Sequence, residues 1–263
     1  MNGVHEFARF KAEGRKISIV TAYDAWSARV VAQSNVDAIL VGDSAEMVIH
    51  GQPTTVTATV GVMALHTRAV VRAAGGKFVI ADLPFLSFRK GIPAAMRAVG
   101  ALVTSGAHAV KLEGVDGHEG VIRHIVESGV PVMGHLGLTP QSVNRFGGFR
   151  VQGRNARDAA TLLRQAHALQ DLGCFSIVLE CVPADLAARI TSELTIPTIG
   201  IGAGGGTDGQ VLVLHDVCGL DTTISPRYVR RYCDGQRLLA EALDAYDADV
   251  KQGAFPTLEE SYS

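Results

Sequence analysis

The sequence lacks the features of a membrane, secreted or nucleic-acid-binding protein. No apolar run approaches the roughly 18 residues that a membrane-spanning helix needs. Residues 1–16 are mixed in polarity and contain no apolar signal-peptide core. A net charge of −2, from 24 basic and 26 acidic residues, gives no electrostatic footprint for nucleic acid or an anionic membrane. We therefore expect a soluble, cytoplasmic protein without nucleic-acid or membrane partners.

Cysteine is scarce, and its four positions do not suit a disulfide or a zinc site. No CxxC pair occurs among Cys174, Cys181, Cys218 and Cys233. Cys174 and Cys181 bracket one expected strand, which would hold them about 23 Å apart at roughly 3.3 Å per residue. That separation is too large for a disulfide. Buried, reduced thiols are the expectation.

Short apolar, β-branched runs alternate with helical stretches along the whole chain. Hydrophobic residues make up 47% and charged residues 19%, which favours a sheet covered on both faces. Strands are expected at 17–21, 38–41, 78–81, 110–114, 130–133, 175–180, 197–201 and 211–214. Helices are expected at 25–33, 60–72, 93–104, 117–128, 156–172, 185–193 and 228–251, with a polar loop after residue 44.

Eight such units predict a single α/β domain over residues 1–263, folded as a (β/α)8 TIM barrel. The fold needs about 250 residues, which matches this chain in count and length. Residues 1–16 form an N-terminal helical extension in this interpretation, and 253–263 form a tail. A doubly wound open sheet is the alternative.

Two opposite charges stand at the end of the fourth expected strand. Lys111 and Glu113 are two residues apart, so they project to the same face of the strand. Burying ionised groups in a parallel strand costs several kcal/mol each. The pair is either a self-satisfied ion pair or part of a binding site.

Other polar residues also fall at or just after expected strand ends. In a barrel these ends converge on the face where active sites lie. Each residue taken alone is explained by a purely structural role, such as helix capping or a hydrogen-bonded histidine in the core. Several carboxylates at one mouth repel, however, and a divalent cation relieves that repulsion. Oxygen ligands without Cys/His spacing favour Mg²⁺. The residues are Asp43, Asp82, Lys111, Glu113, His135, Glu180, His215 and Asp216.

A lysine beside a metal suits an anionic substrate such as a 2-oxo acid. The metal would polarise the keto oxygen and stabilise an enolate formed by proton removal at the neighbouring carbon. Glu180 is the candidate base, because its flanks Leu179 and Cys181 are apolar and favour a raised pKa.

Two further segments leave their roles open. The Gly-Ile-Gly-Ala-Gly run at 200–204 does not have GxGxxG spacing, so close backbone approach is as good an interpretation as a phosphate site. Residues 144–154 carry Arg145, Arg150 and Arg154 around paired glycines. This segment is either a lid or a plain exposed crossover.

Motifs along almost the whole chain resemble the ketopantoate hydroxymethyltransferase family, also called 3-methyl-2-oxobutanoate hydroxymethyltransferase. The nine-residue block Gly-His-Leu-Gly-Leu-Thr-Pro-Gln-Ser at 134–142 is the most specific. The remaining matches are TAYD at 21–24, VGDS at 41–44, ADLPF at 81–85, VKLEG at 110–114, FGGFRVQG at 146–153, LECVP at 179–183, IGIGAG at 199–204 and HD at 215–216.

The resemblance implies transfer of a hydroxymethyl group from 5,10-methylenetetrahydrofolate to 3-methyl-2-oxobutanoate. The product would be 2-dehydropantoate, formed through a Mg²⁺-stabilised enolate in pantothenate and coenzyme A biosynthesis. One Mg²⁺ per subunit and a homo-oligomer, typically a decamer, are also implied. Carried over by position, the metal ligands are Asp43, Asp82 and Glu113, the substrate-binding residues are Asp43, Ser44, Asp82 and Lys111, and the catalytic residues are Glu180 as proton acceptor and His135 in support.

The chain departs from the family pattern near the mouth. Ala45-Glu46-Met47 stands where members commonly have Leu-Gly-Met, which replaces a flexible glycine with a carboxylate. Residues 49–53 differ as well. Two other functions compete with the transferase. One is a Mg²⁺-dependent 2-oxo-acid lyase or phosphoenolpyruvate-mutase-like enzyme on the same barrel, and the other is a non-catalytic barrel that binds a small acid.

Overall fold

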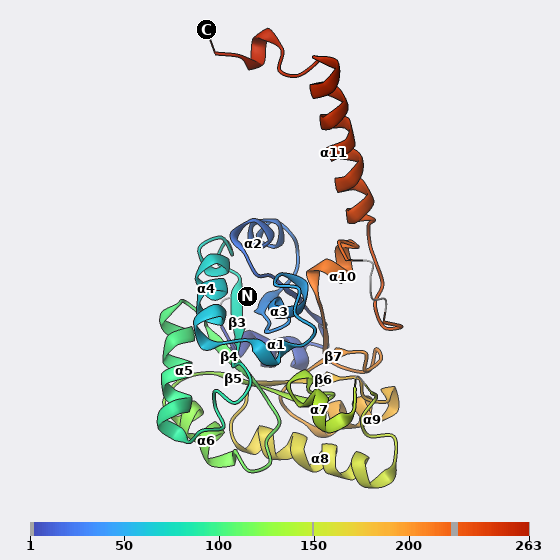
Figure 1. The fold of residues 1–263 in the computed structure, drawn as a ribbon. Coiled ribbons are helices and arrows are strands. Elements are labelled where there is room, and N and C mark those ends of the chain that lie inside the picture. The colour runs from blue at the N-terminus through green and yellow to red at the C-terminus, as the bar shows by residue number, and fades with distance from the viewer. Residues whose placement is uncertain (1–2, 149, 222–225, 263) are drawn as a thin grey trace. The chain divides into compact units, whose positions relative to one another are not determined.

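The chain folds around a closed barrel of eight parallel strands (Figure 1). A computed structural model describes residues 3–148, 150–221 and 226–262. The strands pair in chain order, and β8 closes the barrel against β1. This confirms the expected (β/α)8 architecture. The strands are β1 Ile17–Thr21, β2 Ala38–Val41, β3 Phe78–Asp82, β4 Ala109–Glu113, β5 Val132–Gly137, β6 Ser176–Glu180, β7 Thr198–Ile201 and β8 Gly209–Leu212.

Helices surround the barrel and fall close to the expected ranges. The polar loop expected after residue 44 is confirmed at residues 49–54, and short helices that were not expected precede and follow it. The helices of the barrel unit are α1 His5–Ala12, α2 Ala25–Ala32, α3 Ala45–Val48, α4 Val60–Val71, α5 Ile92–Thr104, α6 Glu119–Glu127, α7 Val143–Phe146, α8 Ala156–Asp171 and α9 Ala184–Glu193, with 3-10 turns η1 Thr55–Thr57 and η2 Pro140–Ser142.

The barrel interior is filled with apolar side chains, and α1 closes its N-terminal end. Phe7 on α1 is fully buried, with its ring centroid 5.7 Å from that of Phe78 and 5.0 Å from that of Phe175. The core continues through inward-facing residues of the strands, including Ile19, Ile80 and Ile199. Because this core fills the N-terminal end of the barrel, ligand-binding groups are confined to the opposite end, the mouth formed by the C-terminal ends of the strands.

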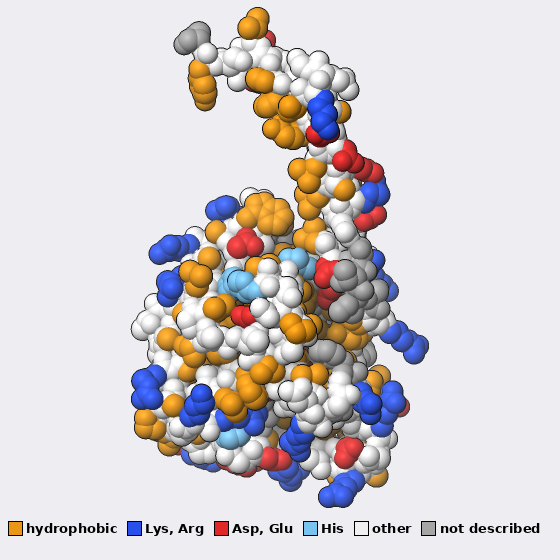
Figure 2. All heavy atoms as spheres, in the orientation of Figure 1, with side chains coloured by type: hydrophobic (Ala, Val, Ile, Leu, Met, Phe, Trp, Pro, Cys, Tyr) orange, Lys and Arg blue, Asp and Glu red, His pale blue; other side chains and the backbone are white. Residues whose placement is uncertain are grey.

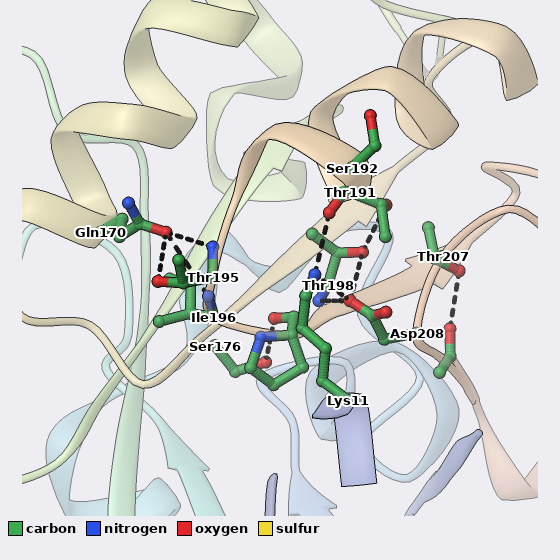
Figure 3. A network of polar contacts seen from close by, with 12 residues as sticks. Lys11, Gln170, Ser176, Thr191, Ser192, Thr195, Ile196, Thr198, Thr207 and Asp208 are labelled. Carbon is green, nitrogen blue, oxygen red and sulfur yellow. Dashed lines mark hydrogen bonds and ion pairs between the residues drawn. The ribbon is translucent and has the colours of Figure 1, made fainter. Parts of the chain in front are cut away.

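A polar network ties the N-terminal end of the barrel together (Figure 3). Lys11 Nζ donates to Asp208 Oδ2 and to the Thr191 carbonyl, both at 2.8 Å. The same Asp208 oxygen accepts from the backbone N–H of Thr198 at 2.9 Å. Thr191 and Thr198 hydroxyls lie 2.6 Å apart. Each charged group here therefore has a close, oppositely polar partner.

The eighth strand begins earlier than expected. It runs from Gly209 to Leu212, because Gly209 pairs with Ile17 of β1 and a Cβ at this position would collide with the Ile17 carbonyl. The apolar run at 211–214 therefore ends the strand and starts helix α10, Leu214–Cys218. His215 and Asp216 consequently belong to α10 and not to a strand end, which corrects the sequence interpretation.

The chain divides into two compact units, the barrel unit Met1–Val213 and a second unit Leu214–Ser263. The second unit contains α10, the long helix α11 Gly235–Gln252 and the 3-10 turn η3 Leu258–Glu260. Helix α11 is shorter than the expected 228–251 and exposes large apolar side chains (Figure 2), which are Leu238, Leu239, Leu243, Tyr246 and Val250.

The described part of the chain contains no helix long and apolar enough to cross a membrane. All four cysteines are free, as expected, but only Cys174 is buried; Cys181 and Cys218 are half-buried and Cys233 is exposed, so the expectation of burial was wrong for these three. Burial raises the pKa of the Cys174 thiol to about 12.

Candidate active site

Strand register brings polar side chains of neighbouring strands side by side at the C-terminal mouth. Asp82 of β3 pairs in register with Lys111 of β4, and Glu113 pairs with His135 of β5. These four residues are at most 5% exposed. Lys111 and Glu113 do share one face of β4, but Lys111 forms its ion pair with Asp82 and not with Glu113. The alternative that Lys111 and Glu113 form an ion pair with each other is therefore excluded.

Lys111 lies among acidic groups contributed by three strands. Its Nζ is 2.8 Å from Asp82 Oδ1 and 3.4 Å from His135 Nδ1. Burial lowers the pKa of Lys111, but the charges of Asp82, Glu113 and Asp43 raise it by more than burial lowers it. The net shift of the pKa is therefore upward. The lysine therefore stays positively charged at neutral pH, as recognition of an anionic substrate requires.

Asp43 follows β2 and is held against β3. Its backbone N–H donates to Asp82 Oδ2 at 3.1 Å, and its own Oδ2 accepts from Gln141 Nε2 at 2.8 Å. Burial and the nearby carboxylates of Asp82 and Glu113 raise the pKa of Asp43 well above its usual value, although Lys111 and Gln141 oppose the shift. The ionised form of Asp43 is therefore disfavoured unless additional positive charge is supplied.

His135 connects Glu113 to Glu180. His135 Nδ1 is 3.5 Å from Glu113 Oε1, and its Nε2 is 3.1 Å from Glu180 Oε2. Burial and Lys111 lower the pKa of His135, whereas Glu113 and Glu180 raise it, to about 9. The imidazole thus lies next to the Glu180 carboxylate, which ends β6 and retains some exposure to solvent.

Ser44 reaches this group of residues through Tyr23. The Ser44 hydroxyl lies 2.7 Å from the Tyr23 hydroxyl. Tyr23 is fully buried, which raises its pKa; the hydrogen bonds with Ser44 and Thr21 oppose this shift, and the charges of Asp82 and Asp43 add to it. The tyrosine therefore keeps its proton and can hold Ser44 in place.

The structure thus brings together seven residues singled out from the sequence, which we call the mouth cluster: Asp43, Ser44, Asp82, Lys111, Glu113, His135 and Glu180. Their individual roles stay predictions. The motif residue Phe149 lies outside the described residues.

Sequence reasoning missed two residues of the site, Tyr23 and Gln141. Both lie in quoted motifs but were given no role. Gln141 is 5% exposed; its side chain donates to Asp43, and its backbone N–H donates to Glu113 Oε2 at 3.0 Å. Its Oε1 is buried without a hydrogen-bond partner among the described residues. The sequence signal that could have identified Gln141 was a side-chain amide in the first turn after a barrel strand.

The mouth cluster has the donor chemistry for Mg²⁺ but not a preformed cage. Among the described residues, no three acidic, His or Cys side chains are arranged to hold an ion as they stand. Mg²⁺ commonly uses one or two carboxylates and completes its shell with water and substrate. Asp43 and Asp82 are adjacent and oxygen-bearing, and the raised pKa of Asp43 reflects crowding that a cation relieves. The residues therefore fit this ion.

A parallel (β/α)8 barrel with buried acidic and basic side chains at its C-terminal mouth defines an enzyme of the TIM-barrel class. The sequence model of the family described as "Ketopantoate hydroxymethyltransferase" matches residues 2–258. The chain belongs to the ketopantoate hydroxymethyltransferase family and is a transferase.

Curated relatives match over nearly their full length. The chain is 54% identical to the 3-methyl-2-oxobutanoate hydroxymethyltransferase of Bdellovibrio bacteriovorus, with 100% of both chains covered. It is 52% identical to the protein of that name from Coxiella burnetii, covering 97% of this chain and 96% of the relative.

More distant solved structures share the fold alone. A phosphonopyruvate hydrolase in complex with oxalate and Mg²⁺ matches with a TM-score of 0.65 at 11% identity, covering 99% of this chain and 93% of that one. A 2,3-dimethylmalate lyase matches with a TM-score of 0.61 at 16% identity, covering 100% and 92%.

Proposed function

We propose that this enzyme transfers a hydroxymethyl group from 5,10-methylenetetrahydrofolate to 3-methyl-2-oxobutanoate and forms 2-dehydropantoate. The observation that carries the proposal is the arrangement His135–Glu180 beside the Lys111–Asp82 pair, which provides an anion site and a separate carboxylate base at one mouth. The names of the relatives, at up to 54% identity over the full chain, support the oxo-acid substrate.

Lys111 binds the carboxylate of the oxo acid in this proposal, and Ser44 adds a hydroxyl donor. Lys111 suits the role because it stays charged although it is buried. Ser44 suits it because the Tyr23 hydroxyl fixes its position. A buried ammonium next to a positioned hydroxyl orients a carboxylate far better than an exposed lysine does.

Asp43 and Asp82 would hold Mg²⁺, with Glu113 reaching the ion directly or through water. When bound, the ion polarises the keto group of the substrate and stabilises the negative charge that develops there. Gln141 holds the second oxygen of Asp43 and, through its backbone, Glu113. It therefore orients the proposed ligands in the way that outer-shell partners do.

Glu180 is the proposed base that removes the C3 proton of the oxo acid. It is separate from Asp43 and Asp82, and its contact with His135 sets its direction. The one-carbon unit is a methylene group bonded to two nitrogens of the donor. Water breaks both of these bonds, so that its oxygen becomes the carbonyl oxygen of the released one-carbon unit and its two protons go to the nitrogens. The electron pair left at C3 then forms a bond to this carbon, and the oxygen takes up the proton that Glu180 removed and becomes the hydroxyl group. His135 supports Glu180 and does not itself contact the transferred carbon in this scheme.

We further propose that the protein acts in the cytoplasm as a homo-oligomer, with a decamer as the expected state. The exposed apolar side chains of α11 support association, because large apolar patches usually mark interaction surfaces. Mass photometry of the purified chain tests this directly. A monomer at micromolar concentration would contradict it.

Proton exchange in D₂O tests the proposed reaction. The protein is incubated with 3-methyl-2-oxobutanoate and Mg²⁺, and the C3 proton is followed by NMR, first without and then with methylenetetrahydrofolate. We expect Mg²⁺-dependent loss of the proton signal without the donor, and 2-dehydropantoate only with it. Absence of exchange under both conditions would rule out base-catalysed activation at C3.

The lyase or mutase alternative shares the fold and a need for Mg²⁺, but it requires no folate. In the same experiment such an enzyme would cleave or rearrange its own 2-oxo-acid substrate and would form no donor-dependent product from 3-methyl-2-oxobutanoate. A barrel that only binds an acid would show neither exchange nor product. Membership of the hydroxymethyltransferase family favours the transferase.

A further inference from the structure

A cavity of about 280 Å³ opens beside the mouth cluster. It lies at the C-terminal ends of β4 and β5 and is bordered by α7 and α8. Gly114 and Gly137 line it, and they stand one residue after Glu113 and two residues after His135. Consecutive Cα atoms are about 3.8 Å apart, so the cavity and the cluster share a wall one or two residues thick. None of the cluster residues lines the cavity itself.

Two arginines line this cavity and form no ion pair with a carboxylate among the described residues, although the charge of Arg145 acts on Asp116 and lowers its pKa. Arg89 Nη2 donates to the Glu113 carbonyl at 2.7 Å, and its Nη1 lies 3.1 Å from His118 Nε2. Arg145 of α7 is exposed toward solvent. Burial lowers the pKa of Arg89, Glu113 opposes this, and Arg145 adds to the lowering. The two guanidinium groups are thus close enough to repel each other.

Two acidic side chains also line the cavity, and one of them forms an ion pair. Both carboxylate oxygens of Asp116 accept from Arg164 Nη2, at 2.9 and 2.8 Å, and Asp116 also accepts from Gln165. Asp158 accepts from the Asn155 side chain at 2.8 Å. Because Asn155 is neutral, it does not compensate the charge of Asp158. The two arginines still outnumber this carboxylate, so the net charge facing the cavity is positive, and an anion with more than one oxygen matches it best.

We propose that this cavity binds the glutamate-tail carboxylates of the one-carbon donor, a reduced folate, with Arg145 and Arg89 as the contacts. The inference rests on the proposed function, which supplies the donor. A pterin ring presents amino and amide donors, which the two guanidinium groups do not match because they carry no acceptor. The tail presents only acceptors in its carboxylates. With the one-carbon unit at the mouth cluster, the tail runs over Gly114 into the cavity.

Donor analogues that differ only in the tail test the proposal. Steady-state kinetics are measured with the monoglutamate donor, a triglutamate donor and a tail-less pteroate donor, for the wild-type chain and Arg145→Ala. We expect Arg145→Ala to raise KM for the glutamate donors about tenfold or more, the loss typical of a charged hydrogen bond. KM for the tail-less donor should be high and equal in both proteins. Arg145→Lys should restore part of the affinity.

Arg123→Ala is the matched control, because Arg123 is an exposed arginine on α6 that does not line the cavity. The proposal is overturned if Arg145→Ala and Arg123→Ala give the same donor KM, or if the wild-type chain does not distinguish tailed from tail-less donors. Measuring C3 proton exchange in D₂O without the donor distinguishes a failure of this cavity assignment from a failure of the proposed function. Exchange that persists with an unchanged donor KM overturns the cavity assignment alone, whereas no exchange in the wild type overturns the proposed function and this inference with it.

Discussion

The two ends of the barrel each contain a lysine–aspartate pair of the same length, in opposite surroundings. Lys11–Asp208 at the N-terminal end and Lys111–Asp82 at the mouth both have an Nζ–Oδ distance of 2.8 Å. At the N-terminal end, backbone N–H and carbonyl groups complete the coordination of both charges (Figure 3). At the mouth, two further carboxylates and a histidine crowd the pair.

The difference separates stability from function within one fold. The N-terminal network satisfies every charge locally, so it holds α1, α9 and the start of β7 together. The mouth cluster leaves Asp43 with a raised pKa and Gln141 Oε1 without a partner among the described residues. Such unrelieved groups persist at sites that await a ligand, where stability is given up for binding and chemistry. Four substitutions test this comparison, from the largest expected effect to the smallest.

Removing the proposed base should have the largest effect. We expect Glu180→Gln to lower the rate of C3 proton exchange by about 10²–10⁴-fold, because a neutral amide cannot accept the proton. Binding of 3-methyl-2-oxobutanoate should persist, since Lys111 and Ser44 remain. NMR exchange and calorimetric titration measure the two quantities. Glu193→Gln, on the exposed face of α9, is the control, and wild-type exchange in Glu180→Gln would exclude this residue as the base.

Breaking the N-terminal network should cost stability instead of activity. Asp208→Ala removes the acceptor shared by Lys11 and the Thr198 N–H. We expect the free energy of unfolding in urea to fall by about 2–3 kcal/mol, the range for leaving buried polar groups unpaired. Proton exchange per folded molecule should stay near the wild-type rate. A loss of exchange without a loss of stability would contradict the division between the two ends.

Gln141→Leu should weaken metal binding at the mouth. The change removes the amide that donates to Asp43 Oδ2 while leaving the backbone contact to Glu113. We expect the Kd for Mg²⁺, measured by calorimetry, to rise about 10–100-fold, as for other outer-shell partners of metal ligands. Gln165→Leu is a matched control, because Gln165 donates to Asp116 away from the cluster. Equal Kd values for the two variants would remove Gln141 from the metal site.

The fold was predictable because each strand carries its own local signal. β-Branched runs such as Ile17–Thr21 and Ala38–Val41 were located to the residue, since period and residue type do not depend on distant contacts. The end of β8 could not be located in this way, because the apolar run at 211–214 contains both the end of the strand and the start of helix α10. Only the register of Gly209 against Ile17 fixes the division.

The position of the mouth residues was predictable, but their partners were not. Strand ends in a barrel must converge, so the sequence alone placed Asp43, Asp82 and Glu180 at one face. Pairing depends on register between strands, which matched Lys111 with Asp82 across the sheet and not with Glu113 two residues away. Gln141 binds a carboxylate 98 positions away in the chain, and no local pattern reports such a contact.

The smallest predicted change, Asp43→Asn, tests the central claim that the mouth is charged to receive a divalent cation. Burial and neighbouring carboxylates raise the pKa of Asp43, so in the metal-free protein this group lowers the unfolding free energy as pH rises above the unfolded pKa of Asp, about 3.9. We therefore expect metal-free Asp43→Asn to be more stable than the wild type by about 1 kcal/mol at neutral pH, with the difference shrinking in acid.

The most direct measurement is urea unfolding of both proteins at pH 7.5 with EDTA and with excess Mg²⁺. The account predicts that Mg²⁺ raises the unfolding free energy of the wild-type chain, since a ligand that binds only the folded state stabilises it. Asp43→Asn, already relieved of the charge, should show little further gain. Equal Mg²⁺ stabilisation of both proteins, or a metal-free variant less stable than the wild type, would contradict it.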